Sequence, residues 1–376
     1  MSYHDQEQNT NPADGSGKSP GQGPAPVTAG DALPVFERMQ PWGPQDILPE
    51  DYPEIDPDYL RPDLVSPVAL PPSQSGIPPE AWMPAEWQRK SSSASVVEPN
   101  SVVEDNGRTY HGYKVGKYYL PNDAAEQDRL DGLHYSSKLM LHNRLHLAPI
   151  QSPKRVLDLA TGTGIWVMEF GQEHPECEVV GTDLSKIQPE HPPENIQFIR
   201  DDAEEPWEFG PEKFDFIHAR YVCTCFDKPK AVMKQAFDNL KPGGWVEYQD
   251  SALDILSMDG STQGTTVERW GELLTMGAAA NGRDLRVSRN YKHWLEEIGF
   301  VDVTERKIAG PIGPWCKSAR QKDMGRVMAR GFYDNVTGLS YKLFKGMGFT
   351  EEQIEDFATR FRADLVSPAI HAYFPM

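Results

Sequence analysis

Cysteines, basic residues and long apolar runs are all scarce in this sequence, and each scarcity excludes a class of protein. Four of the 376 residues are cysteine (Cys177, Cys223, Cys225 and Cys316), too few and too scattered for a disulfide framework. Lys and Arg number 37 against 56 Asp and Glu, and the formal net charge of −19 disfavours a broad nucleic-acid-binding surface.

Membrane and secretion signals are missing as well. No stretch approaches the roughly 18 consecutive apolar residues of a membrane span. The initial residues, MSYHDQEQNT, lack the basic and apolar regions of a signal peptide. We therefore expect a soluble protein of a reducing compartment, either the cytosol or the nucleus.

The first hundred residues differ in composition from the rest of the chain. They contain 18 of the 33 prolines, and 15 acidic residues against 5 basic ones. Proline removes a backbone donor and restricts the residue before it, so no long helix or strand fits here. We predict a disordered, acidic, proline-rich tail over residues 1–100 and a globular domain over residues 101–376. A docking segment is the alternative, because three tryptophans and the run DYPEI at 51–55 are more apolar than a plain linker.

Short apolar runs alternate with helical patterns along the globular part. The predicted strands are Arg155–Ala160, Glu178–Leu184, Ile196–Asp202, Phe214–Tyr221, Trp245–Asp250 and Phe300–Lys307. Helical patterns cover 124–147, 164–173, 228–240, 266–280, 289–298, 318–346 and 351–364. This alternation favours a mostly parallel sheet covered by helices. Right-handed crossovers then give a doubly wound α/β topology.

A glycine-rich turn follows the first of these strands. Asp158, Gly162 and Gly164 stand between that strand and the next helix. Glycines there let the backbone turn tightly and approach a ligand closely, and α/β sheets bind ligands outside the carboxyl ends of their strands. Asp183 ends the second strand, where a carboxylate accepts hydrogen bonds from ribose hydroxyls. A ligand that contains a nucleoside is therefore expected.

The same turn discriminates between two such ligands. A dinucleotide fingerprint requires a third glycine, but Val167 occupies that position. The carboxylate of Asp158 would repel the pyrophosphate of NAD, whereas it suits the ammonium of S-adenosylmethionine. An NAD-linked oxidoreductase is therefore disfavoured.

A second acidic cluster ends the third predicted strand. It consists of Asp201, Asp202 and Ala203. A carboxylate there can accept from the adenine amino group, and the following backbone N–H can reach a ring nitrogen. The alternative is an acidic residue that caps a helix.

These segments, taken together, resemble a known family. The resemblance is carried by Asn106–Gly112, Leu120–Asp123, Glu126–Asp131, Asp158–Trp166, Asp183–Pro189, Asp201–Ala203 and Lys241–Gly244. They resemble class I S-adenosylmethionine-dependent methyltransferases and, more narrowly, the fungal LaeA-like group, over about residues 104–376. The chain departs from that pattern at Ala160 and Thr161, where Gly-Cys or Gly-Ser is more usual.

The resemblance implies a fold, a cofactor and a biological role. The fold would be a seven-stranded, Rossmann-like sheet with an N-terminal lid and a helical insertion after strand six. The cofactor would be S-adenosylmethionine, used in fungal secondary metabolism or its regulation, with a small metabolite or a protein as methyl acceptor. The alternative is a cofactor-binding regulatory protein, part of a velvet-type complex in the nucleus, with little or no catalysis.

Three further side chains have two interpretations each. Tyr110 and Tyr119 lie in the expected lid, where they can cover a sulfonium by cation–π contact or simply fill the core. His218 ends the fourth strand, where it can act as a general base or be a structural histidine bonded to its surroundings. Cys223 and Cys225 lack a second ligand pair, so no metal site is predicted.

Overall fold

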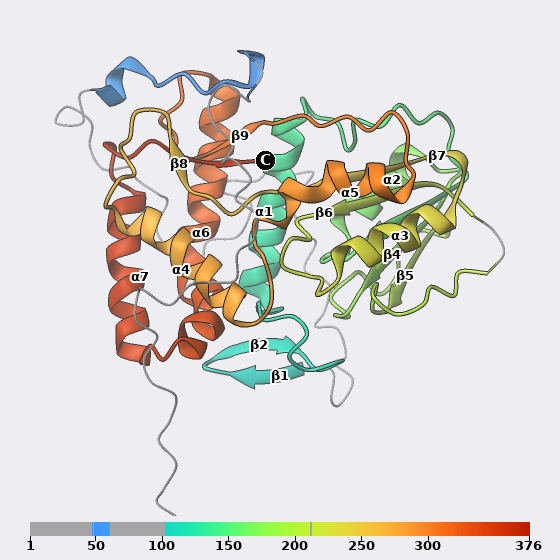
Figure 1. The fold of residues 1–376 in the computed structure, drawn as a ribbon, viewed down its shortest axis with the longest axis horizontal. Coiled ribbons are helices and arrows are strands. Elements are labelled where there is room, and N and C mark those ends of the chain that lie inside the picture. The colour runs from blue at the N-terminus through green and yellow to red at the C-terminus, as the bar shows by residue number, and fades with distance from the viewer. Residues whose placement is uncertain (1–46, 48, 61–101, 211–212) are drawn as a thin grey trace, which may run out of the picture. The chain divides into compact units, whose positions relative to one another are not determined.

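The computed structural model describes residue 47 and residues 49–60, 102–210 and 213–376 (Figure 1). Most of the predicted tail, including its three tryptophans, lies outside the described residues. From residue 102 onward, a parallel sheet flanked by helices lies beside a mostly helical part.

The central sheet has five strands, all parallel, in the order β5-β4-β3-β6-β7. They are β3 (Arg155–Leu159), β4 (Glu178–Asp183), β5 (Ile196–Arg200), β6 (Phe214–Arg220) and β7 (Leu240–Gln249). The chain winds from β3 to β5 in one direction and then returns to β6 beside β3. The prediction of a doubly wound α/β sheet is confirmed, and the order of the strands reverses between β3 and β6, where such sheets bind ligands.

Alternate side chains of the central strands face opposite layers of helix, as the two-residue period of a strand requires. Val156 packs with Trp166 and Phe170 of α2 (Ile165–Glu173). Its neighbour Leu157 belongs to the cluster that includes the apolar face of α3 (Pro229–Asn239). Helix α5 (Tyr291–Ile298) contacts α3. Both faces of the sheet are therefore covered, which explains why its strands are short apolar runs.

The expected sixth and seventh strands do not extend this sheet. The segment predicted as a strand over 300–307 is irregular and largely exposed or half-buried. The chain instead forms a separate antiparallel sheet in the order β8-β10-β9, from β8 (Leu256–Ser257), β10 (Ala372–Pro375) and β9 (Ala309–Ile312). The residues of β9 and β10 are all buried. The central sheet thus has five strands rather than seven, because these apolar segments pair with each other beneath the helical part.

Four helices build that helical part: α1 (Ala124–Met140), α4 (Thr266–Ala280), α6 (Ala319–Gly346) and α7 (Glu351–Leu365). They share one large core that includes Trp270, Phe344 and Phe361. The helix predicted over 124–147 ends early, because His142 and Asn143 adopt left-handed φ values of 55° and 64°. Among the described helices, none has the length and apolar character that crossing a membrane requires.

A hairpin precedes α1. Strands β1 (Val102–Asp105) and β2 (Arg108–His111) pair antiparallel across Asn106 and Gly107, whose φ values of 48° and 70° are those of a tight hairpin turn. Asp123 then caps α1, because its side chain accepts from the backbone N–H of Glu126. The hairpin and the loop after it stand where the sequence predicts a lid.

One part of the proline-rich region is packed on the domain. Residues 49–60, which we call the strap, contain two short 3-10 turns (Pro49–Asp51 and Pro57–Leu60). Ile55 pairs with Cys316 in an antiparallel bridge, and the backbone N–H of Lys317 donates to Glu54 O at 2.8 Å. The strap is therefore an exception to the predicted tail.

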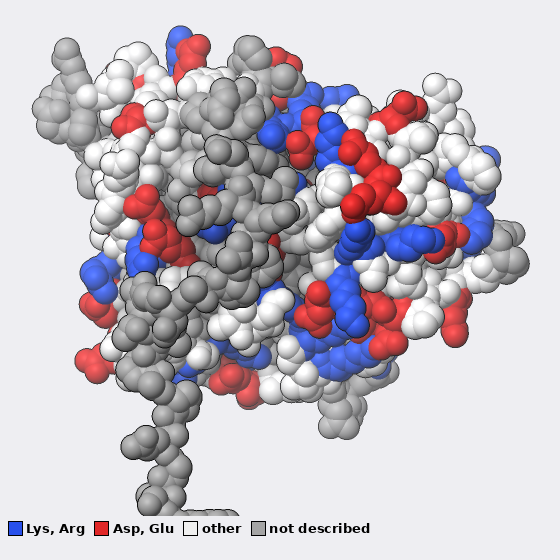
Figure 2. Space-filling view, viewed as in Figure 1, with Lys and Arg blue, Asp and Glu red and all other residues white. Residues whose placement is uncertain are grey.

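Charge of both signs is mixed on the face drawn in Figure 2. On its described part, Lys and Arg side chains gather in a band over the right-hand half of the view, with Asp and Glu side chains beside them.

Candidate functional site

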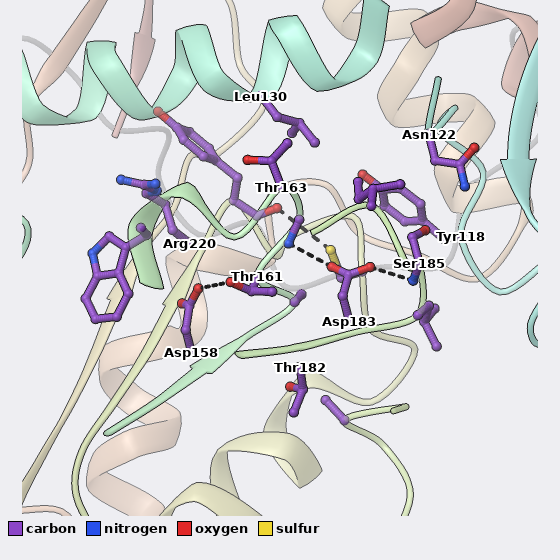
Figure 3. A pocket seen from close by; sticks show the side chains of 18 of the residues that line it. Tyr118, Asn122, Leu130, Asp158, Thr161, Thr163, Thr182, Asp183, Ser185 and Arg220 are labelled. Carbon is purple, nitrogen blue, oxygen red and sulfur yellow. Dashed lines mark hydrogen bonds between the residues drawn. The ribbon is translucent and has the colours of Figure 1, made fainter. Parts of the chain in front are cut away.

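A cavity opens at the carboxyl ends of β3, β4, β5 and β6 (Figure 3). The sequence-predicted residues in its lining are Asp158, Gly162, Asp183, Asp201, Asp202, Ala203 and His218. Three others, Gly164, Tyr110 and Tyr119, are not among the lining residues. Parallel pairing of four strands thus gathers side chains that lie up to 60 residues apart in the sequence.

Asp183 is held at the end of β4 by backbone donors. Its Oδ2 accepts the N–H of Gly162 at 2.8 Å, and its Oδ1 accepts the N–H of Ser185 at 2.8 Å. Burial raises the pKa of Asp183 to about 6, although these backbone bonds act in the opposite direction. Each carboxylate oxygen has a second lone-pair site, so this fixed group can accept from a ribose diol, and that contact stays a prediction.

The glycine turn is shaped by left-handed backbone. Gly162 and Gly164 have φ values of 57° and 79°, and a Cβ on Gly164 would lie 2.7 Å from the ring of Phe198. Gly164 therefore supports the turn from behind and does not line the cavity itself. Ala160, at the position where the family resemblance expects glycine, has a φ of 51°.

We expect Ala160→Gly to stabilise the protein. Left-handed backbone costs a residue with a Cβ about 1–2 kcal/mol, whereas the extra freedom of glycine in the unfolded chain costs about 0.5–1 kcal/mol. The net gain should be about 0.5–1 kcal/mol, read from urea denaturation midpoints. Ala160→Val should lower the midpoint, since a β-branched residue tolerates this φ least. A lower midpoint for the glycine variant would contradict this account.

Asp158 and His218 form a buried pair. Nδ1 of His218 lies 2.7 Å from Oδ1 of Asp158, and Oδ2 of Asp158 accepts the hydroxyl of Thr161 at 2.6 Å. The imidazole is fully buried and stacks on the indole of Trp166, with 4.0 Å between ring centroids and 3° between planes. Sequence reasoning did not link the two residues, which become neighbours only because β3 and β6 pair in this register. His218 therefore fixes the carboxylate of Asp158.

At the other end of the cavity, Asp202 accepts hydrogen bonds from two lysines. Its Oδ2 accepts from Nζ of Lys114 at 2.9 Å and of Lys117 at 2.7 Å. Burial alone would raise the pKa of Asp202, but hydrogen bonds from the two lysines lower it below its ordinary value. Asp202 therefore anchors the loop that carries the lysines, and the contact of Asp201, Asp202 and Ala203 with adenine stays a prediction.

Among the tyrosines of the hairpin and the loop after it, Tyr118 lines the cavity and the two predicted ones do not. Tyr110 is 1% exposed and packs under Nζ of Lys342, 3.5 Å from the ring centroid. Tyr119 faces Arg283 and stacks on Tyr118. Neither ring lines the cavity, whereas Tyr118 does. Tyr118 and Tyr119 are adjacent in an irregular loop, and the sequence there has no periodic pattern that indicates which of the two rings faces the cavity.

Arg220 is the cationic side chain that sequence reasoning left without a role. It ends β6, lines the cavity, and donates from Nη2 to Nδ1 of His134 at 2.7 Å. Because a guanidinium only donates, Nδ1 is the acceptor and the proton of the neutral imidazole lies on Nε2. That atom is 3.2 Å from Oε2 of Glu169. Burial, and next the charge of Arg220, lower the pKa of His134 well below its usual value, so His134 is neutral at pH 7.

The polar groups around the cavity were also compared with the donor sets that hold metal ions. Within the described ranges, no group of three or more His, Cys, Asp or Glu gathers closely enough to hold a metal ion. Cys225 lines the cavity as a free thiol, and burial raises its pKa to about 12. The thiol is therefore protonated at pH 7.

Comparison with known proteins agrees with this geometry. A family described as "Methyltransferase domain" matches residues 133–305. The chain is 36% identical over 273 residues to the methyltransferase pytC of Aspergillus terreus, which covers 72% of this chain and 84% of pytC. It is 31% identical over 300 residues to the protein-methionine methyltransferase laeA of Emericella nidulans, covering 77% and 80%. It is 30% identical over 292 residues to the secondary metabolism regulator LAE1 of Cochliobolus heterostrophus, covering 75% and 95%.

These matches extend over both the sheet and the helical part. They confirm the methyltransferase class predicted from the sequence, and the family assignment carries with it the predicted cofactor, S-adenosylmethionine. The chain belongs to the methyltransferase family that contains pytC and the LaeA proteins.

Proposed function

We propose that this protein binds S-adenosylmethionine in the cavity and transfers its methyl group, in fungal secondary metabolism or its regulation. The observation that carries the proposal is Asp183, a carboxylate fixed by the N–H groups of Gly162 and Ser185 at the edge of the cavity. The relatives named as secondary metabolism regulators support the biological role.

The order of strands supports an orientation for the cofactor. Asp201 stands at the end of β5, Asp183 at the end of β4, and Asp158 on β3 beside β6. Three strand spacings of about 4.8 Å separate β5 from β6, a span of roughly 14 Å. An extended cofactor would therefore direct its adenine toward Asp201, its ribose toward Asp183 and its methionine arm toward Asp158.

The side chains around the cavity favour a neutral acceptor. S-adenosylmethionine supplies an electrophilic methyl group, and the protein's part is to orient the acceptor and exclude water. Burial raises the pKa of Tyr118, Tyr221 and Cys225, so these groups are protonated at pH 7, and His218 is hydrogen-bonded to Asp158. None of these four side chains is therefore well placed to remove a proton from the methyl acceptor. A thioether or a neutral amine needs no base. The name of the Emericella relative, a protein-methionine methyltransferase, agrees with such an acceptor.

The affinity for S-adenosylmethionine is expected to rise as pH increases through 6. Burial holds the pKa of Asp183 at about 6 in the free protein, and only its ionised form accepts from both ribose hydroxyls without giving up an acceptor site. Binding at pH 5 should then be about tenfold weaker than at pH 8. Isothermal titration across this range measures the effect.

Asp183→Ala provides the matched variant for that titration. It should bind at least about tenfold more weakly at pH 8, since hydrogen bonds to a charged acceptor contribute about 1.5–3 kcal/mol each, and it should lose the dependence on pH. Wild-type affinity in the variant would remove the ribose assignment. A folded wild-type protein that binds no S-adenosylmethionine at any pH would contradict the proposed function itself.

A regulator that binds the cofactor without turnover is the second candidate. The relatives described as regulators favour it, and a velvet-type protein would be its partner. In the organism that carries this gene, a deletion strain should be compared with one that carries Gly162→Asp, which blocks the turn under Asp183. If the variant restores the metabolites of the wild type, the role is structural; if it loses them as the deletion does, the role requires a bound cofactor.

We also propose the cytoplasm or the nucleus as the location. All four cysteines are free, which agrees with a reducing compartment. Fluorescent tagging of the full chain tests this.

A further inference from the structure

We propose that Arg220 binds the carboxylate of the cofactor's methionine arm. This inference rests on the proposed function and assigns a residue to the part of the cofactor that the predicted site left without a partner. Figure 3 shows Arg220 and Asp158 at one end of the cavity, with Ser185, Tyr118 and Asn122 at the other.

The position of Arg220 follows from the sheet. Arg220 is the last residue of β6, and β6 pairs with β3 so that His218 lies opposite Asp158. The guanidinium therefore stands at the β3–β6 end of the cavity, beyond the ribose contact at β4. A cofactor whose ribose lies on Asp183 extends its amino-acid arm toward this end.

The orientation of Arg220 is fixed from behind. Nη2 donates to His134 of α1, and Nε2 of His134 lies 3.2 Å from Glu169 of α2. Helices on two sides thus hold one edge of the guanidinium. Five N–H groups are available in an arginine side chain, and the contact with His134 uses only one nitrogen. The remaining donors can serve a planar, bidentate acceptor.

The charge of Arg220 lacks an anion in direct contact. Among the described residues, Arg220 forms no ion pair, and its one hydrogen-bond partner, His134, is neutral. Asp158, Glu169 and Asp131 are near enough to favour the charge. The carboxylates of Asp158 and Asp131 accept instead from Thr161 and Thr163, and that of Glu169 lies beside Nε2 of His134 and accepts from Nζ of Lys138. Burial consequently lowers the pKa of Arg220. A carboxylate that entered the cavity would supply the missing anion.

The chemistry of the pair identifies which carboxylate fits. An α-amino acid presents an ammonium and a carboxylate on one carbon, and here Asp158 and Arg220 offer the two complementary charges at one end of the cavity. An acidic methyl acceptor would need the cation but not Asp158. We therefore assign Arg220 to the cofactor.

Three adenosyl ligands separate the contributions of the amino-acid arm. S-adenosylhomocysteine carries the ammonium and the carboxylate, S-adenosyl-3-thiopropylamine carries the ammonium only, and 5′-deoxy-5′-methylthioadenosine carries neither. Titration calorimetry of the wild-type protein should show S-adenosylhomocysteine binding at least about tenfold more tightly than the decarboxylated ligand, as a charge-assisted pair requires.

Two variants then test the residue. Arg220→Met should weaken S-adenosylhomocysteine at least about tenfold and leave the other two ligands within about twofold. Arg269→Met, which removes an exposed arginine that pairs with Glu272 on α4, is the matched control and should change none of the three. Wild type alone suffices for the first comparison if the Arg220 variant does not fold.

The outcomes distinguish a failure of the proposed function from a failure of the Arg220 assignment. If the wild-type protein binds none of the adenosyl ligands, the proposed function fails. If it binds them, but the decarboxylated ligand binds as tightly as S-adenosylhomocysteine, the assignment of Arg220 fails alone. An equal loss for all three ligands in Arg220→Met would also overturn the assignment, because it would show that Arg220 supports the cavity rather than the carboxylate.

Discussion

Replacing Gly325 with alanine is expected to destabilise the protein by more than about 3 kcal/mol. Gly325 lies on α6 where the helix passes the end of β9, and a Cβ there would lie 2.0 Å from Gly313 O and 2.7 Å from its carbonyl carbon. The backbone N–H of Gly313 also donates to Gly325 O at 3.0 Å, so the two segments cannot move apart without losing that hydrogen bond. Overpacking a core usually costs about 1–3 kcal/mol, and contact with backbone rather than a mobile side chain should exceed that range.

Gly346→Ala is the control in the same helix. A Cβ at that position, at the end of α6, would meet no atom within 4 Å. Alanine is favoured over glycine in helices by up to about 1 kcal/mol, so this variant should unfold at an unchanged or slightly higher urea concentration. Similar midpoints for the two variants would show that α6 and β9 do not approach as closely as described.

Asp51→Ala is expected to cost about 2–4 kcal/mol of folding free energy. Asp51 is fully buried, and its Oδ2 accepts from Nε and Nη2 of Arg306 at 3.0 and 2.7 Å. Removal of one partner from a buried pair costs about 3–5 kcal/mol, because the other charge stays behind without compensation. Arg306 is 28% exposed, which lets water recover part of that loss.

A second acidic residue of the strap supplies the comparison. Glu54 pairs with Lys317, and both side chains are about two-thirds exposed. Glu54→Ala should therefore change the unfolding free energy by less than about 1 kcal/mol. Thermal unfolding of both variants separates a strap that contributes to the fold from one that merely rests on it. If Asp51→Ala left the unfolding free energy unchanged, the strap would not contribute to the fold and would belong to the tail predicted from composition.

The parallel sheet could be predicted because it depends on local signals. Strands such as Arg155–Leu159 are apolar runs with turn residues after them. The observed ends of β3, β4, β5 and β6 lie within two residues of the expected ones, whereas β7 begins at Leu240 rather than at Trp245. The helix before β7 ends at Asn239, two residues before Lys241, where the Lys-Pro-Gly-Gly stop signal begins. Such elements are determined by the period of apolar side chains and by the positions of glycine and proline, which are signals within a few residues of the element.

The remainder depends on pairing between distant segments. Arg220 and His134 are 86 residues apart, and Asp51 lies 255 residues from Arg306. No local pattern indicates either contact, since both require helices and strands to be placed first. The two lysines that donate to Asp202 come from a loop 88 and 85 residues earlier, so the sequence around Asp202 does not indicate them either.

The antiparallel sheet has a consequence for folding during synthesis. Its middle strand, β10, begins about 115 residues after β8 and 60 after β9, whereas the five parallel strands span only residues 155–249. At roughly 5–20 residues per second, a ribosome would take on the order of ten seconds to complete that interval. Strands β8 and β9 would meanwhile expose unpaired backbone, which invites pairing with other chains. We expect the nascent protein to depend on chaperones in this window, after its cofactor-binding sheet has been made and before the helical part can close.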